Sequence, residues 1–420
     1  MNYGLIGEKL PHSFSALIHR QLFDYEYELK ELRPDELELF MRARDFQAIN
    51  VTIPYKEAVI PYLDNMDDVA ASIGAVNTIV HRNGKLYGYN TDFLGLCALI
   101  ERSGISLTDK KVLILGSGGT SKTAMAAARR LGCAVAWRVS RTAREGCLTY
   151  EQAKVHHWDA QVIINTTPCG MYPNSGESPV DLSDYPHLEG VVDVIYNPLR
   201  TRLVCDALRR GVPAVGGLYM LVAQAAFAAE RFVGSSVLPE RIDEIYRCLL
   251  AEKENIVLVG MPACGKSTVG KRLAEMLDRP FVDTDALIVE KTGCAIPALF
   301  ERVGESGFRD YEAQVVAEVS VRQGAIIATG GGAVLRPENV ERLKENGRLY
   351  FLDRSVGLLT ATADRPLSAT PAELQRRYAE RYPIYSAVCD AKIVADGSSE
   401  EVANLIREGF LYEHFGNQRP

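Results

Sequence analysis

Residues 256–268 of this chain read IVLVGMPACGKST. An aliphatic run ends at Gly260, four residues separate it from Gly265, and a helical pattern follows the Lys-Ser pair. This order of strand, glycine-rich loop and helix binds nucleotide phosphates, because glycines let backbone N–H groups turn toward the phosphates and the helix presents its positive end. The second half of the chain is therefore predicted to be a P-loop domain with a parallel sheet.

The polar residues of this loop have defined tasks in phosphoryl transfer. We expect Lys266 to reach the β- and γ-phosphates of ATP, and the Ser267 hydroxyl to take one position around Mg²⁺. Cys264 precedes the helix N-terminus, where a thiol becomes reactive, so we expect its oxidation to block nucleotide use. The alternative is a glycine-rich turn that binds nothing. The predicted ATP-binding residues are Gly260, Gly265, Lys266, Ser267 and Thr268.

The length and composition are those of a protein with several domains. A chain of 420 residues exceeds what one hydrophobic core usually serves, so we expect two or three domains. The net charge of −7 argues against nucleic acid as a partner, and no apolar run is long enough to cross a membrane. Nine cysteines without a CxxC pair favour reduced thiols and a cytoplasmic protein. The oligomeric state stays open, with a homo-oligomer among the options.

The first ninety residues place polar side chains at the ends of predicted strands. Strands are expected over 3–7, 48–53, 73–80 and 86–92, the last two joined by a turn at 83–84. Ligands bind at strand ends in an open α/β sheet, although serines in loops more often cap helices. The polar residues concerned are Ser13, Ser15, Thr52, Lys56, Asn77 and Asp92.

A second nucleotide-binding pattern lies between these residues and the P-loop. Residues 111–115 form a predicted strand, GSGGTS follows at 116–121, and an alanine-rich helix is expected over 122–131. This is a loop of the dinucleotide-binding type, although it departs from GxGxxG. The glycines expected to approach the cofactor are Gly116, Gly118 and Gly119.

The strand over 134–139 indicates which dinucleotide is bound. It ends in Ser140, Arg141 and Thr142, whereas an NAD site would place an acidic residue there for the ribose hydroxyl. A 2′-phosphate fits such a polar and basic turn, so NADP is favoured over NAD. The alternative is an exposed basic turn.

Residues 1 to about 250 resemble the shikimate dehydrogenase family. The resemblance rests on an ordered set of motifs: HSFS at 12–15, NVTIPYK at 50–56, GAVNT at 74–78, YNTD at 89–92, the loop at 116–121, NTTP at 165–168, DVIYNP at 193–198 and GLYMLVAQ at 217–224. It implies a substrate-binding domain over 1–92, completed by 218–251, and an inserted NADP-binding Rossmann-type domain over 93–217.

The same resemblance implies reduction of 3-dehydroshikimate by NADPH. Lys56 would polarise the ketone oxygen and donate a proton to it, and Asp92 would hold both groups in place. A surface salt bridge is the alternative for this pair. Ser13 and Ser15 would bind the substrate carboxylate. The residues expected to hold its hydroxyls or close the pocket are Thr52, Asn77, Tyr196 and Gln224.

Residues 254–420 resemble shikimate kinase, of the nucleoside-monophosphate-kinase-like P-loop group. The motifs are FVDTD at 281–285, FRDYE at 308–312, GGG at 330–332, DRPL at 364–367 and ERYPIY at 380–385. By this resemblance, Asp283 would bind Mg²⁺ together with Ser267. Asp285 would orient or deprotonate the attacking hydroxyl, and Arg365 would neutralise the transferring phosphate.

The resemblance also implies how the kinase half binds its acceptor. Arg309 and Arg381 would bind the shikimate carboxylate, since a planar guanidinium makes two parallel bonds to it, and Gly331 would bring a backbone N–H close to the ligand. Segment 358–363 lacks the arginine that stacks on adenine in many relatives, so no adenine-binding residue is predicted.

Three functions are compatible with these patterns. The first is a bifunctional enzyme that makes shikimate and then shikimate 3-phosphate. The second is a shikimate or quinate dehydrogenase whose P-loop domain only senses nucleotide, which the presence of Asp285, Arg309 and Arg381 disfavours. The third is a catabolic quinate or shikimate oxidoreductase joined to an unrelated kinase.

Overall fold

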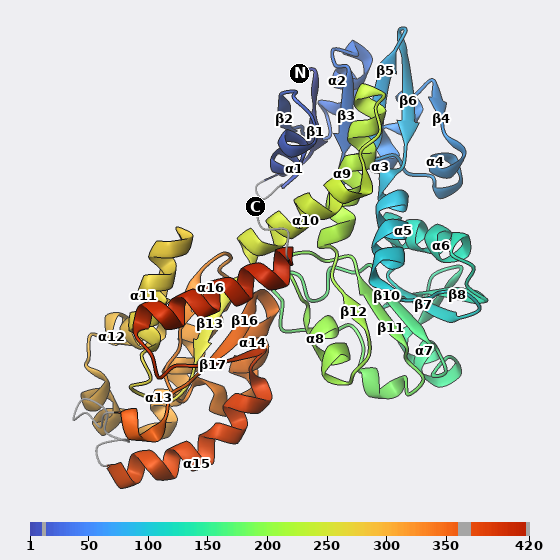
Figure 1. Ribbon diagram of the computed structural model, residues 1–420. Coiled ribbons are helices and arrows are strands. Elements are labelled where there is room, and N and C mark those ends of the chain that lie inside the picture. Colours follow the sequence, from blue (N-terminus) through green and yellow to red (C-terminus); the bar gives the residue numbers. More distant parts are fainter. Residues whose placement is uncertain (11–13, 360–370, 417–420) are drawn as a thin grey trace. The chain divides into compact units, whose positions relative to one another are not determined.

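The computed structural model describes residues 1–10, 14–359 and 371–416, which form two compact units, Met1–Tyr246 and Arg247–Pro420 (Figure 1). Both units consist of sheets with helices between most successive strands, which confirms the predicted α/β class. The boundary between them falls within helix α10 (Pro239–Lys253). The finer limits expected from the sequence, at 92, 217 and 254, stay predictions.

The first sheet of the first unit has six strands in the order β2-β1-β3-β5-β6-β4. The strands are β1 (Tyr3–Gly7), β2 (Tyr27–Glu31), β3 (Ala48–Val51), β4 (Asn65–Met66), β5 (Thr78–Arg82) and β6 (Lys85–Tyr89), and the helices are α1 (Ser15–Leu22), α2 (Leu37–Ala43), α3 (Tyr55–Ala58) and α4 (Asp68–Ile73). β1 and β3 run parallel with Ile6 opposite Val51, so the segments that follow them leave the sheet at the same edge.

The second sheet is parallel throughout, in the order β12-β11-β10-β7-β8-β9. Its strands are β7 (Lys111–Leu115), β8 (Val135–Ser140), β9 (Cys147–Thr149), β10 (Val162–Asn165), β11 (Gly190–Asp193) and β12 (Ala214–Val215), and the helices of this part are α5 (Thr91–Ser103), α6 (Gly119–Arg130), α7 (Tyr150–His156), α8 (Arg202–Arg209) and α9 (Leu218–Val233). β10 and β11 are entirely buried, as a parallel sheet covered on both faces requires. α9 packs against α5 and α1, which precede it by many residues in the sequence.

The second unit has one parallel sheet in the order β14-β15-β13-β16-β17. Its strands are β13 (Asn255–Val259), β14 (Phe281–Asp283), β15 (Ile326–Ala328), β16 (Gly347–Asp353) and β17 (Ala391–Val394), and its helices are α11 (Lys266–Leu277), α12 (Thr284–Thr292), α13 (Ile296–Ser320), α14 (Pro337–Asn346), α15 (Pro371–Val388) and α16 (Ser399–Phe415). All five residues of β13 are buried, and α11 lies beside α16 (Figure 1). The carboxyl ends of β13, β14 and β15 therefore meet at one edge. Within the described ranges, no helix has the length and apolar character needed to cross a membrane.

Candidate active sites

The first unit contains a cavity of about 390 Å³. It is lined by seven of the residues expected to handle substrate: Ser15, Thr52, Lys56, Asn77, Asp92, Tyr196 and Gln224. They come from α1, α3, α5 and α9, from the segments that follow β3 and β11, and from the residue that precedes β5. Ser13 lies outside the described residues.

Lys56 and Asp92 form an ion pair in this cavity. The distance between Lys56 Nζ and Asp92 Oδ2 is 2.6 Å, and the side chains are 27% and 17% exposed. Asp92 lies in the first turn of α5, where the helix dipole favours a carboxylate. An ammonium held by a carboxylate beside a cavity can bind a carbonyl oxygen and deliver a proton to it.

A buried hydrogen-bond network holds the amides that face the cavity. Asn77 Nδ2 donates to Thr91 Oγ1 (3.0 Å) and to Gln224 Oε1 (3.5 Å), while Asn77 Oδ1 accepts from the Thr91 backbone N–H (2.7 Å). Asn50 Nδ2 donates to the Asn77 carbonyl (3.2 Å), and the Tyr27 hydroxyl donates to Asn50 Oδ1 (2.7 Å). Because a satisfied buried network is rigid, these amides are oriented before any ligand binds.

Burial also determines the state of the aromatic residue in the cavity. It raises the pKa of Tyr196, so the phenol stays protonated at neutral pH. A neutral phenol can both donate and accept a hydrogen bond, which suits contact with a substrate hydroxyl.

The glycine-rich loop after β7 has the geometry of a dinucleotide site. Gly116 has φ +125°, and a Cβ there would come within 2.4 Å of Thr166 Oγ1, so only glycine fits. A Cβ on Gly118 or Gly119 would meet no atom within 4 Å, which leaves the start of α6 open to a ligand. That helix has no side-chain cap, so its N-terminus suits a phosphate.

The turn after β8 lies beside this loop, because β7 and β8 are neighbouring strands. Ser140 ends β8, its Oγ accepts from the Thr142 backbone N–H (3.4 Å), and Arg141 is exposed. Hydroxyls next to an exposed guanidinium suit a 2′-phosphate, which has charge and several acceptor oxygens.

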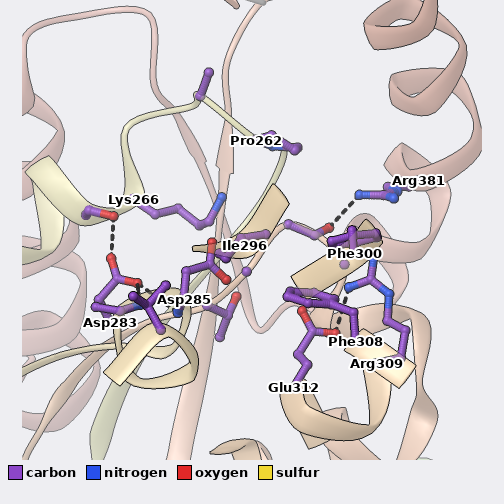
Figure 2. A pocket seen from close by; sticks show the side chains of 18 of the residues that line it. Pro262, Lys266, Asp283, Asp285, Ile296, Phe300, Phe308, Arg309, Glu312 and Arg381 are labelled. Carbon is purple, nitrogen blue, oxygen red and sulfur yellow. Dashed lines mark hydrogen bonds and ion pairs between the residues drawn. The ribbon is translucent and has the colours of Figure 1, made fainter. Parts of the chain in front are cut away.

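The second unit contains a larger cavity, of about 690 Å³. It is lined by nine of the residues predicted for the kinase half: Gly265, Lys266, Ser267, Thr268, Asp283, Asp285, Arg309, Gly331 and Arg381. Figure 2 shows Lys266 and Asp283 on one side of this cavity and Arg309 and Arg381 on the other, with Asp285 between them. The cavity therefore has a side that suits phosphate and a side that suits a carboxylate.

Lys266 is folded into the loop that precedes α11. Its side chain is buried, and Nζ donates to the carbonyls of Gly260 (2.9 Å) and Met261 (2.8 Å). Gly265 has φ +96°, which turns the chain into the helix at this point. The positive charge of Lys266 is thus held within the loop. There, phosphate oxygens can replace the two carbonyls as acceptors of its hydrogen bonds.

Two P-loop predictions come out differently in the structure. Gly260 does not line the cavity but lies at the base of the loop, where its carbonyl binds Lys266. The side chain of Cys264 is only 1% exposed and lies 3.7 Å from Lys266 Nζ. The expectation of a reactive thiol is therefore wrong, because a buried cysteine is shielded from oxidants. Arg365 lies outside the described residues.

Ser267 and Asp283 present oxygen ligands side by side. Ser267 Oγ donates to Asp283 Oδ2 (2.6 Å). The other carboxylate oxygen of Asp283 accepts from the backbone N–H groups of Asp285 (3.0 Å) and Ala286 (3.2 Å), which caps α12. No group of three or more metal-ligating side chains occurs among the described residues. A hydroxyl and one carboxylate fit Mg²⁺, which keeps several waters and binds mainly to substrate phosphates.

Asp285 and Glu312 approach each other across Gly330. A Cβ on Gly330 would lie 2.6 Å from Asp285 Oδ1 and 2.8 Å from Glu312 Oε1, so only glycine leaves room for both carboxylates. Glu312 is fully buried, and burial raises its pKa against the opposing effect of Arg309. The Gly330 backbone N–H donates to Thr284 Oγ1 (2.9 Å), which ties the glycine run to α12.

Two arginines from different helices face the glycine run. Arg309 in α13 donates to Glu312 Oε2 (2.8 Å) and to Glu305 Oε1 (3.4 Å), and Arg381 in α15 donates to the Gly331 carbonyl (3.0 Å). Both are nearly buried, at 9% and 6% exposure. Two guanidinium groups held beside one cavity suit an anionic ligand with a planar carboxylate.

Comparison with known proteins identifies the first unit. Residues 5–79 match the family model of the shikimate dehydrogenase substrate binding domain. The shikimate dehydrogenase (NADP(+)) of Clostridium beijerinckii is 36% identical over 245 residues, covering 54% of this chain and 90% of that protein. This chain belongs to the shikimate dehydrogenase family.

Solved structures agree with this assignment of the dehydrogenase unit. Shikimate dehydrogenase 1 from Peptoclostridium difficile is 36% identical with a TM-score of 0.54, covering 59% of this chain and 98% of that one. Shikimate 5-dehydrogenase from Thermus thermophilus, solved in complex with NADP(H) and shikimate, is 28% identical with a TM-score of 0.54, covering 59% and 99%.

The second unit adds a different enzyme to the dehydrogenase. Residues 262–409 match the family model of shikimate kinase. The chain is therefore a bifunctional shikimate-pathway enzyme, a dehydrogenase joined to a kinase, and both predicted resemblances are confirmed.

Several side chains around the two sites were not predicted. Asn50 lines the dehydrogenase cavity, and its place in the motif at 50–56 was a usable signal. Glu312 lies three residues after Arg309 on a helix, a spacing that brings opposite charges together. Phe300 and Arg377 line the kinase cavity without any sequence signal of their own.

Proposed function

We propose that the dehydrogenase unit reduces the ketone of 3-dehydroshikimate with NADPH, and that the kinase unit transfers the γ-phosphate of ATP to a hydroxyl of shikimate. The observation that carries this proposal is that each unit has its own cavity, one built around Lys56 and Asp92 and the other around Lys266 and Asp285. Each cavity combines groups for binding the substrate with groups for moving a proton or a phosphate.

In the dehydrogenase unit, Lys56 is the proton donor. When bound, NADPH supplies the hydride, so the protein has to orient the ketone and provide one proton. Lys56 Nζ would donate a hydrogen bond to the ketone oxygen and pass its proton there as the alcohol forms. Asp92, 2.6 Å away, keeps the ammonium in position and stabilises its charge before the transfer.

The remaining lining residues would orient the substrate. Ser13 and Ser15 would bind the carboxylate with their hydroxyls, and Ser15 is the first residue of α1. Thr52 and Tyr196 would contact ring hydroxyls, and the linked amides of Asn77 and Gln224 offer a donor and an acceptor at fixed positions. Such an arrangement favours an acceptor with several hydroxyls, because an analogue without them would leave buried polar groups unpaired.

The cofactor of the dehydrogenase unit is proposed to be NADP. The pyrophosphate would lie over Gly116, Gly118 and Gly119, and the 2′-phosphate at Ser140, Arg141 and Thr142. Support comes from the absence of an acidic residue at the end of β8 and from the Thermus thermophilus relative, whose structure contains NADP(H).

In the kinase unit, Asp285 would accept the proton of the attacking hydroxyl. Glu312, a carboxyl whose pKa is raised by burial, lies beside Asp285 across Gly330. Lys266 and Arg365 would neutralise charge on the transferring phosphoryl group, and the backbone N–H groups of the loop up to Thr268 would bind the other phosphates.

Mg²⁺ is proposed to bind at Ser267 and Asp283. The ion would neutralise the β- and γ-phosphates when it is bound. The Ser267 hydroxyl and one Asp283 oxygen would face it, while the other Asp283 oxygen stays bonded to the start of α12.

On the acceptor side, Arg309, Arg381 and the backbone of Gly331 would hold the shikimate carboxylate. Because these residues and Asp285 line the same cavity as the P-loop, the kinase unit has a place for an acceptor as well as for a nucleotide. This argues against a domain that only senses nucleotide, for which acceptor groups have no use.

Two assays on the purified chain test the proposal. NADPH oxidation is followed with 3-dehydroshikimate, with NADH as the comparison cofactor, and ADP formation is followed with shikimate, with quinate as the comparison acceptor. We expect both activities and a preference for NADPH and shikimate. NADPH oxidation without any ADP formed from shikimate would favour the nucleotide-sensing alternative.

A further inference from the structure

Helix α15 carries a second arginine that lines the kinase cavity. Arg377 lies one helical turn before Arg381, and both side chains line the cavity. The Nε atom of Arg377 is buried and has no hydrogen-bond partner among the residues that the structure describes. A buried guanidinium nitrogen without a partner is costly unless a ligand supplies the acceptor.

The charged side chains that line the cavity have an excess of one positive charge. Among the described residues, four cationic and three acidic side chains line it: Lys266, Arg309, Arg377 and Arg381, against Asp283, Asp285 and Glu312. Arg309 is paired with Glu312, Lys266 is bonded to two loop carbonyls, and Arg381 is bonded to the Gly331 carbonyl. Arg377 is the one cation of the four with no hydrogen bond or ion pair to another described residue.

The surroundings of Arg377 disfavour its positive charge. Burial lowers its pKa, and Arg381 on the same helix lowers it further, against a smaller attraction from Glu305 and Glu380. Two guanidinium groups one turn apart repel each other, and an anion between them would remove that repulsion.

We propose that Arg377 is a specificity-determining residue of the kinase site, where it binds the carboxylate of the acceptor as a third guanidinium beside Arg309 and Arg381. The inference rests on the proposed phosphorylation of shikimate and extends it to a residue without an assigned role. The acceptor side is favoured over the nucleotide side because Arg377 shares a helix face with Arg381. It is also attracted by Glu305, which is itself bonded to Arg309.

The test compares the wild-type chain with Arg377→Met, which keeps an unbranched apolar stem and removes the charge. Steady-state ADP formation is measured with shikimate and with a shikimate analogue that carries a neutral carboxamide in place of the carboxylate. We expect the KM for shikimate to rise roughly 10- to 100-fold, with kcat and the KM for ATP changed less than about twofold. The preference for shikimate over the carboxamide should fall by the same factor.

Two control variants separate binding from structure. Arg376→Met removes the neighbouring exposed arginine, which pairs only loosely with Glu380 (3.7 Å), and should leave every constant unchanged. Arg377→Lys should restore part of the affinity, since it returns the charge without the planar fork.

Three results would overturn the inference. They are an unchanged KM for shikimate in Arg377→Met, an equal rise for shikimate and the carboxamide, or a rise in the KM for ATP alone. If the wild-type chain forms no ADP with shikimate, the proposed function itself fails. If the wild type is active and the Arg377→Met variant is unaffected, only the inference about Arg377 is contradicted, and the proposed function stands.

Discussion

Replacing Gly332 by alanine should weaken shikimate binding in the kinase unit and leave its nucleotide site intact. Gly332 has φ −107° and ψ −2°, which alanine can adopt, so the backbone does not oppose the change. A Cβ at this position would lie 2.1 Å from Nη1 of Arg309 and 2.3 Å from its Cζ and Nη2. Ordinary contacts begin near 3.4 Å, so the guanidinium has to move by about 1 Å or more.

The size of the effect follows from what Arg309 is proposed to do. Each hydrogen bond to a charged group contributes about 1.5–3 kcal/mol, and a guanidinium displaced by about 1 Å loses its parallel geometry with a carboxylate. Loss of one such interaction raises the KM for shikimate roughly 10- to 150-fold. The KM for ATP should stay within about twofold, because Gly332 is not part of the P-loop.

The assay is ADP formation with varied shikimate at saturating ATP·Mg²⁺, with NADPH oxidation by the same sample as an internal control. Gly409→Ala is the matched control, because it lies in α16 and a Cβ there meets no atom within 4 Å. That variant should keep all constants and gain up to about 1 kcal/mol of helix stability. An unchanged KM for shikimate in a folded Gly332→Ala variant would refute the role given to Arg309.

Three further outcomes are expected. Lys56→Ala should abolish NADPH oxidation while ADP formation from shikimate continues, and Lys266→Ala should do the reverse; loss of both activities in a soluble variant would contradict separate sites. Ser267→Ala should raise the Mg²⁺ concentration for half-maximal ADP formation by roughly tenfold, whereas an unchanged requirement would exclude this hydroxyl from the metal site. Burial lowers the pKa of His19 from 6.5 to about 3. The unfolded chain therefore binds a proton at His19 below pH 6.5 while the folded chain does not, so stability is complete above pH 6.5 and falls as the pH drops toward 3. The unfolding free energy should decrease by about 2 kcal/mol between pH 7 and pH 5. His19→Phe keeps the ring stacked on Tyr27 and should abolish that loss in urea unfolding, and an equal loss in the variant would show that His19 is not its source.

Much of both sites could be predicted because strand ends meet at one edge of a sheet. Lys56 and Asp92 are 36 residues apart in the chain, yet each follows a strand of the same sheet and they form an ion pair. The same geometry joins the P-loop after β13 to Asp283, the last residue of β14. Motifs that follow successive strands therefore carried reliable information about which side chains gather around each cavity.

Other features depend on packing between segments that no local pattern connects. The approach of Asp285 and Glu312 across Gly330, and the fit of Arg309 against Gly332, arise where three separate segments meet. Cys264 looked reactive from its place before a helix, but the fold buries its side chain. Lys266 was assigned to phosphates, and only the structure reveals that two loop carbonyls accept hydrogen bonds from it.

The central claim is that one chain carries out two consecutive reactions at two sites. The most direct test is to measure the ratio of ADP formed to NADPH oxidised. The purified chain receives 3-dehydroshikimate as the only acceptor, together with NADPH and ATP·Mg²⁺, and the amounts of NADPH oxidised and ADP formed are measured at completion. We predict one ADP for each NADPH, with shikimate 3-phosphate as the final product and no ADP when NADPH is omitted. Complete NADPH oxidation without ADP, or ADP formation from 3-dehydroshikimate in the absence of NADPH, would contradict the claim.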